Sequence, residues 1–357
     1  MAYTTIDDPS AHFQIALYTG QGGTATTVTN DGNSDLQPDL IFFKSRSTTA
    51  RWNVMDSTRG TTKVLYPDGN DAEATDGGDA KPLDSFNSDG FTAGESLDHH
   101  TNISGASMVA WQWKANGGTT STNSSGSSNS TVQANTTAGF SIVKRTGTGS
   151  AGATYGHGLG AVPDVIINKG LNSNEWYSYF KAIGGGTHWI DLSGTGAKVD
   201  DANMWNDTDA TSTLFTVGNS GGSNGSSVEY IAYCFTSIQG YSKFGSYTGN
   251  ANDDGPFIYT GFKPKFAIFK ASSASGEGWA IRDSARSPFN QMSHKLSANV
   301  NAAEGTTADD NDCDFLSNGI KLRSNDNQMN KTGTTFIYMA FAEHPFVSSE
   351  GVPVTAR

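Results

Sequence analysis

Two short stretches of the sequence place an acid, a hydroxyl and a base at matched spacing. The stretches MDSTRG and RDSARS each put an aspartate (Asp56, Asp283) three residues before an arginine (Arg59, Arg286). Such a set supports nucleophilic catalysis only with a general base nearby, and no histidine recurs beside both stretches. We therefore expect a structural role, in which each aspartate pairs with its arginine or caps a turn, and we expect no catalytic residues.

An acidic run and a histidine pair are the candidates for binding a metal. Grouped carboxylates suit Ca²⁺, and the sequence groups four of them at Asp309, Asp310, Asp312 and Asp314. Their spacing is not that of an EF-hand, so solvated loop acids are the competing interpretation, and we expect no other cofactor. The neighbours His99 and His100 would point to opposite faces of a strand, which argues against a shared metal.

The seven tryptophans fall into two groups. Trp52, Trp176 and Trp279 recur in one sequence context and are expected in the core. Four others do not recur in this way and are candidates for surface contact with sugars or partner proteins: Trp111, Trp113, Trp189 and Trp205.

These residues belong to a pattern that the chain repeats three times. The proline phrases are QPDLIFFKSR, VPDVIINKG and KPKFAIFKAS, with Pro38, Pro163 and Pro264 at equivalent places. An opening strand precedes each phrase, and a tryptophan phrase, a glycine-marked strand and an apolar closing strand follow it. Because the same order of elements recurs, the sequence predicts three related β units.

The residue pattern also predicts how the strands pack. The proline cannot donate to a ladder and marks a strand entrance, while the apolar run after it indicates a strand that is buried on both faces. In the closing strands, large and small side chains alternate, as Trp111 and Ala110 do. We expect an all-β fold of three tandem β-sandwich-like domains with little helix; closure into barrels is the alternative.

The expected organisation follows from the repeat and from composition. Residues 116–139 are rich in Gly, Ser, Thr and Asn and are expected to form a linker. The predicted segments are an N-terminal tail (1–12), three β repeats (13–115, 140–242, 243–347) with the linker (116–139) between the first two, and a C-terminal tail (348–357).

Composition excludes several classes of function. The formal net charge of −12 disfavours binding to nucleic acid and to anionic membranes. We expect no secretory signal, because the first residues have no basic start and no apolar core, and no membrane span, because no apolar run is long enough. Cys234 and Cys313 show no spacing that suggests a disulfide.

The combined phrases resemble a family of proteins from tailed bacteriophages, especially marine ones. The resemblance covers roughly residues 8–346 and includes FQIALYTG, SFNSDGF, VAWQWKA, FGSYTGNANDDGPFIYTGF and FIYMAFAEHPF. It implies a non-enzymatic virion protein, expected to be a tail fibre or tail appendage that contributes to host-surface attachment. The alternatives are a capsid decoration or head-fibre protein and, in another class, a glycan-binding or glycan-cleaving protein.

The resemblance also sets expectations about partners and location. Tail fibres are often trimers, so a homo-oligomer, by default a trimer, is expected, together with other virion proteins and a host-surface glycan or receptor as partners. Nucleic acid binding and membrane insertion are not expected. The chain would be located in the virion, which is assembled in the host cytoplasm and released by lysis.

Overall fold

Strands dominate the parts of the chain that the structure describes. The computed structural model describes residues 2–76, 81–95, 99–306 and 312–354. Within these ranges the α-helices are single turns, α1 (Ala202–Trp205), α2 (Gly221–Asn224) and α3 (Asn327–Asn330). The prediction of a mostly β fold with little helix is confirmed.

Three large antiparallel sheets contain the same strand order: opening, closing, proline-phrase and tryptophan-phrase strand. The first is β1 (Phe13–Thr19), β9 (Ser107–Trp113), β3 (Leu40–Ser45) and β4 (Asn53–Asp56). The second contains β12 (Phe140–Thr146), β19 (Glu229–Phe235), β14 (Val165–Gly170) and β15 (Trp176–Phe180). The third contains β20 (Ser242–Thr248), β27 (Thr335–Pro345), β22 (Phe262–Ala271) and β23 (Ala280–Asp283). We call these the first, second and third strand sets, and we count each connecting loop and added strand with the set whose strands it joins or extends.

Additional strands extend two of the sheets. The second sheet gains β10 (Ser121–Asn123), β11 (Ser130–Asn135), β16 (His188–Asp191) and β17 (Val199–Asp200), and the third gains β24 (Leu296–Ser297). The expected linker at 116–139 therefore contains two paired strands. In β11, Val132 is buried in an apolar cluster, and the amide of Gln133 donates to the hydroxyls of Ser57 (2.9 Å) and Thr58 (2.6 Å). Threonine and valine favour strands, and the overall content of polar residues in this stretch does not reveal that preference.

A smaller sheet accompanies each large one. The small sheets are β2 (Thr26–Val28) with β8 (Phe91–Ala93) and β7 (Leu83–Phe86); β13 (Ala153–Gly156) with β18 (Leu214–Val217); and β21 (Phe257–Tyr259) with β26 (Gly319–Leu322) and β25 (Cys313–Leu316). A further two-stranded sheet, β5 (Lys63–Val64) and β6 (Ala74–Thr75), follows β4 in the chain. An apolar cluster joins each small sheet to one face of its large sheet.

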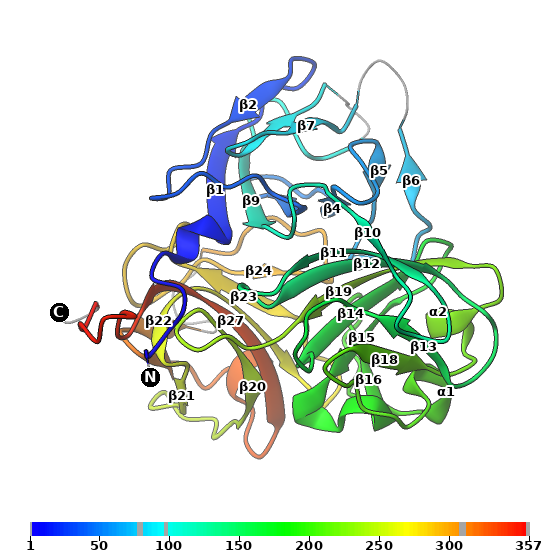
Figure 1. Ribbon diagram of the computed structural model, residues 1–357. Helices are drawn as coiled ribbons and strands as arrows, with labels where there is room; N and C mark the ends of the chain where they lie inside the picture. The colour runs from blue at the N-terminus through cyan, green and yellow to red at the C-terminus, as the bar shows by residue number, and fades with distance from the viewer. Residues whose placement is uncertain (1, 77–80, 96–98, 307–311, 355–357) are drawn as a thin grey trace.

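The opposite faces of the large sheets meet in a common core. In β27, Tyr338 and Ala340 belong to the cluster under the small sheet, whereas Met339 and Phe341 belong to a central cluster. That central cluster draws residues from all three strand sets, which lie around it in Figure 1 as blue-to-cyan, green and yellow-to-red ribbons. The predicted alternation in the closing strands is confirmed, and the strand sets share one core.

The segment expected as an N-terminal tail is packed against the rest of the chain. Ile6 belongs to the central cluster, and the Thr4 hydroxyl donates to the carbonyl oxygen of Gln239 at 2.8 Å. The amide of Ser349 donates to the Asp7 carboxylate at 2.7 Å. The first and last described segments therefore meet on one side of the molecule (Figure 1).

The packing of β11 predicts a measurable difference between two neighbouring residues. Replacing buried Val132 with alanine removes apolar contacts and should lower the free energy of unfolding by about 2 kcal/mol. Thr131→Ala, on the opposite face of β11, should change the free energy of unfolding by less than about 0.5 kcal/mol. Urea titration of both variants measures these changes. Equally small changes in the free energy of unfolding for both variants would mean that residues 116–139 are a loose linker.

Candidate functional site

The most elaborate arrangement of side chains lies where the three strand sets meet, a region that we call the central junction. Trp52, Trp176 and Trp279 are all buried there, which confirms their predicted place in the core. Each indole N–H donates to a backbone carbonyl of another strand set, in one rotational sense. The contacts are Trp52 Nε1 to the oxygens of Ser297 (3.1 Å) and Val300 (3.0 Å), Trp176 Nε1 to Tyr66 (2.9 Å) and Trp279 Nε1 to Asp191 (2.9 Å).

Backbone hydrogen bonds close the same ring in the opposite sense. In each strand set, the loop after the tryptophan strand sends one amide to the end of the next set's proline-phrase strand. These contacts are Glu73 N to Leu171 O (2.9 Å), Lys198 N to Ser272 O (2.8 Å) and Glu304 N to Arg46 O (2.8 Å). Every strand set thus gives hydrogen bonds to both of its neighbours.

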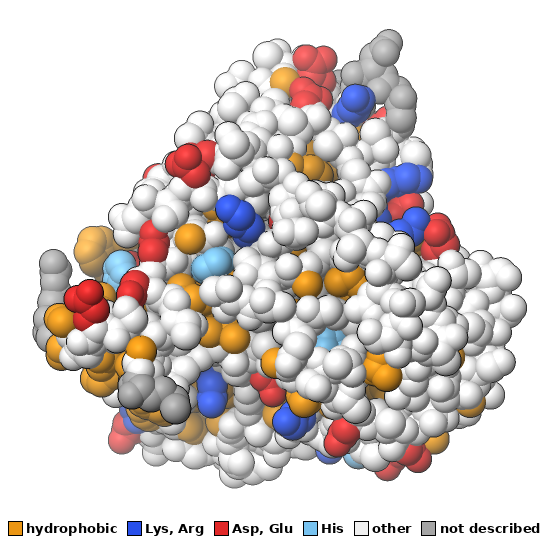
Figure 2. Space-filling view, viewed as in Figure 1, with side chains coloured by type: hydrophobic (Ala, Val, Ile, Leu, Met, Phe, Trp, Pro, Cys, Tyr) orange, Lys and Arg blue, Asp and Glu red, His pale blue; other side chains and the backbone are white. Residues whose placement is uncertain are grey.

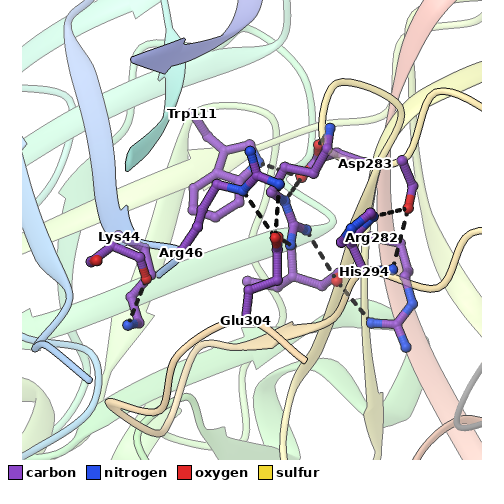
Figure 3. A network of polar contacts seen from close by, with 11 residues as sticks. Lys44, Arg46, Trp111, Arg282, Asp283, His294 and Glu304 are labelled. Carbon is purple, nitrogen blue, oxygen red and sulfur yellow. Dashed lines mark hydrogen bonds and ion pairs between the residues drawn. The ribbon is translucent and has the colours of Figure 1, made fainter. Parts of the chain in front are cut away.

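A buried ionic network links the third strand set to the first (Figure 3). The Asp283 carboxylate accepts from Arg286 Nε at 2.6 Å and from the Trp111 indole at 3.1 Å. Arg286 also bonds Glu304 at 2.7 Å, and Glu304 in turn binds Arg46 at 2.8 Å. The backbone amide of Arg286 donates to Asp283 as well, at 2.9 Å, so the predicted ion pair and turn cap are both present.

The first strand set builds the same network against the second. Arg59 Nε lies 2.5 Å from the Asp56 carboxylate, which also accepts from the Tyr233 hydroxyl at 2.8 Å. Burial alone would lower the pKa of Arg59, but the charges of Asp56, Tyr233 and Glu73 and the hydrogen bond to Asp56 together outweigh burial and raise that pKa. Burial, followed by the charge of Asp56, raises the pKa of Tyr233 well above its usual value. The predicted structural role of the Asp–Arg pairs is therefore confirmed.

The second strand set fills the equivalent position with apolar side chains. Asp56, Phe180 and Asp283 face Leu40, Val165 and Phe266 at the same register of the three sheets. Phe180 replaces the carboxylate, Ile183 stands three residues later where the arginines stand, and both join the central cluster. Met339 takes the place of Trp111 and Tyr233 on the closing strand.

Three recurring lysines bind backbone carbonyls at the rim of the junction. Lys44 Nζ donates to Asn301 O at 3.2 Å and Lys270 Nζ to Thr195 O at 3.3 Å, both in other strand sets, while Lys169 donates to Asn174 O. Burial lowers the pKa of each of the three lysines to about 8. Sequence reasoning missed this feature, although a lysine ends the apolar run of every proline phrase.

The arrangement of charges at the junction suits structure better than catalysis. The carboxylates of Asp56 and Asp283 are fully buried and already hold an arginine and a second donor. A carboxylate in this state can neither take a proton from a substrate nor bind a metal without breaking the ion pair. Among the described residues, no group of three or more His, Cys, Asp or Glu side chains could hold a metal ion.

The tryptophans expected at the surface are mostly in the core. Trp111 and Trp205 are 1% exposed and Trp113 is 6% exposed, because large side chains at these places fill the clusters on either face of the sheets. Trp189 is partly buried and packs edge-on against Tyr177, with ring centroids 4.9 Å apart. The prediction of surface aromatics does not hold for the three buried residues.

The candidate metal ligands do not form one site in the described residues. Asp309 and Asp310 lie outside the described residues, Asp312 is buried, and Asp314 pairs with Arg323 at 2.6 Å. His99 contacts the Tyr66 hydroxyl at 3.0 Å, while His100 accepts from the Arg51 amide at 3.1 Å.

Cys234 and Cys313 are buried free thiols, and burial raises the pKa of each to about 12. Within the described chain, no helix has the length and apolar character needed to cross a membrane.

The two ways of building the junction predict that single and concerted substitutions differ. Asp56→Ala leaves buried Arg59 without its closest carboxylate and should cost about 3–5 kcal/mol of unfolding free energy. The concerted variant D56F/R59I/E73K/Y233M introduces the residues that stand at the equivalent places where the second strand set meets the third, namely Phe180, Ile183, Lys198 and Met339. It should lose less unfolding free energy than D56A alone. Chemical denaturation compares the two variants, and a larger loss for the concerted variant would contradict this interpretation.

The recurring lysines predict a pH dependence with a defined sign. Because burial holds their pKa near 8 instead of 10.5, the unfolded chain binds more protons between these values. Stability should therefore rise with pH through this window, by up to about 1.4 kcal/mol per pH unit per lysine. The variant K44M/K169M/K270M should lose this rise and be more stable than the native chain at pH 7.5.

Denaturation of both proteins from pH 7.5 to 9 measures the difference between their slopes. That comparison isolates the lysines, because the cysteines and tyrosines are unchanged. K44M alone serves as the partial control, with about one third of the effect. Identical slopes for the native chain and the triple variant would show that the lysines are not buried cations.

Comparison with known proteins finds a family and no characterised relative. No curated protein and no solved structure matches the chain. One family model matches residues 8–345, which spans all three strand sets and the central junction. The chain therefore belongs to the family described as "Domain of unknown function (DUF7483)".

Proposed function

We propose that this chain is a non-enzymatic structural protein of a bacteriophage virion, a tail fibre or tail appendage that contributes to host-surface attachment. The sequence resemblance over roughly residues 8–346 motivates this proposal. The observation that carries it is the central junction, where the buried acids and bases bind one another and the strand sets are interlocked. Such an arrangement suits mechanical rigidity.

We also propose that the three strand sets are copies of one ancestral β-sandwich-like unit. The identical strand order, the small sheet over each large sheet and the equivalent junction contacts support this. Fusion of the copies into one chain would give a compact spike module, in which each copy supplies its inner face to the core and its outer loops to the surroundings.

The surface composition fits many weak contacts with a host surface. On the face in Figure 2, charged and apolar side chains are scattered among neutral polar side chains and backbone. Neutral hydroxyl and amide groups form exchangeable hydrogen bonds with surface glycans, and many copies on one particle add weak contacts into avidity. A homotrimer bound to other virion proteins is the proposed assembly.

The alternatives predict different places or activities. A capsid decoration or head-fibre protein would have the same rigidity but lie on the head. A glycan-cleaving enzyme needs two facing carboxylates about 5–10 Å apart in a cleft, whereas Asp56 and Asp283 are buried in ion pairs. The junction therefore favours a structural protein over a glycosidase.

Immunogold labelling tests the proposed location directly. Antibody raised against the purified chain should decorate the tail of intact phage particles whose genome encodes it. Labelling of the head would support the capsid alternative. Particles that carry no label, while the chain is detected in the lysed host, would contradict a virion role.

The proposed assembly predicts the mass of the purified chain in solution. Light scattering after size-exclusion chromatography should give three times the chain mass of 37.6 kDa. A concentration-independent mass of one chain would contradict the homotrimer. Incubation with host-surface polysaccharide serves as the activity control and should release no reducing ends.

A further inference from the structure

A small apolar chamber lies at the centre of the junction. Its volume is about 50 Å³, and all three strand sets supply its lining. Phe42, Ile167 and Ile268 occupy equivalent places in this lining, each two residues before a recurring lysine. The chamber therefore lies where the inner faces of the three large sheets converge.

Unequal side chains at equivalent places account for the empty space. Phe42 faces Trp111 across its sheet, Ile167 faces Tyr233, and Ile268 faces Met339. The first strand set thus brings two aromatic rings to the centre, whereas the third set brings two aliphatic side chains. Native cores are normally close-packed, so a chamber of this size at the meeting point of three sheets is a distinct feature.

The lining decides what the chamber can hold. Aromatic and aliphatic side chains dominate it; its hydroxyl groups are those of Tyr233, which is committed to Asp56 at 2.8 Å, and of Ser178. A buried water needs two to four polar partners, and apolar cavities of engineered proteins stay dry and bind xenon or benzene. The chamber is smaller than a typical benzene-binding cavity of about 150 Å³, which limits its ligand to a few heavy atoms.

We propose that this chamber is a binding site for one small apolar molecule, of the size of xenon or a short hydrocarbon. Dispersion contacts with the aromatic rings would supply the affinity. Because the chamber exists only when the three strand sets are assembled, the ligand binds the folded chain and not the unfolded chain. Binding therefore stabilises the junction. The inference is independent of the proposed virion role.

Xenon is the probe for this site, because it is apolar and visible by both NMR and anomalous diffraction. In the intact chain under xenon pressure, one xenon atom per chain should lie between Ile268 and Phe42. The melting temperature should rise with xenon pressure. The variant I268F copies the residue of the first strand set into the third and fills the chamber, so it should weaken xenon binding at least tenfold.

Matched variants keep the test decisive. Ile268→Leu conserves volume and should bind xenon like the native chain, while Ile167→Phe provides a second filled chamber if I268F fails to fold. Circular dichroism checks the fold of each variant. Native xenon affinity in a folded I268F or I167F protein, no xenon bound by the native chain, or ordered water in the chamber would each overturn the proposal.

Discussion

The structure depends on one contact that recurs three times: a buried indole N–H group of each strand set donates to a backbone carbonyl of another strand set. An unsatisfied buried donor costs about 1–3 kcal/mol, and Trp52, Trp176 and Trp279 each avoid this cost by using a carbonyl of another strand set. No strand set can therefore satisfy its own tryptophan alone. The amide contacts that run in the opposite sense make this dependence mutual.

The same junction position is built with two different chemistries. Asp56–Arg59 and Asp283–Arg286 are fully buried ion pairs, while Phe180 and Ile183 fill the corresponding place with apolar surface. Buried ion pairs add little net stability over well-packed apolar side chains, but they tolerate few alternative arrangements. In this chain, the ionic versions join the first strand set to both of its neighbours.

Much of the fold could be predicted from local patterns, whereas the contacts between strand sets could not. The repeated order of elements, the buried proline-phrase strands, the alternation in β27 and the Asp–Arg pairs all follow from residues close together in sequence. The sequence does not predict the burial of Trp111 and Trp113, because burial on the inner face depends on sheets that approach from other strand sets. The composition of residues 116–139 predicts a linker, because composition does not reveal that Val132 and Gln133 face opposite sides of a paired strand.

The central claim is that the three strand sets form one cooperative unit through their shared core. Native-state hydrogen exchange measures this most directly, since it gives an opening free energy for each amide. The account predicts that slow amides of β9, β19 and β27 open with one common free energy, equal to that of global unfolding. Three distinct opening free energies, with one strand set exchanging while the other two stay protected, would contradict it.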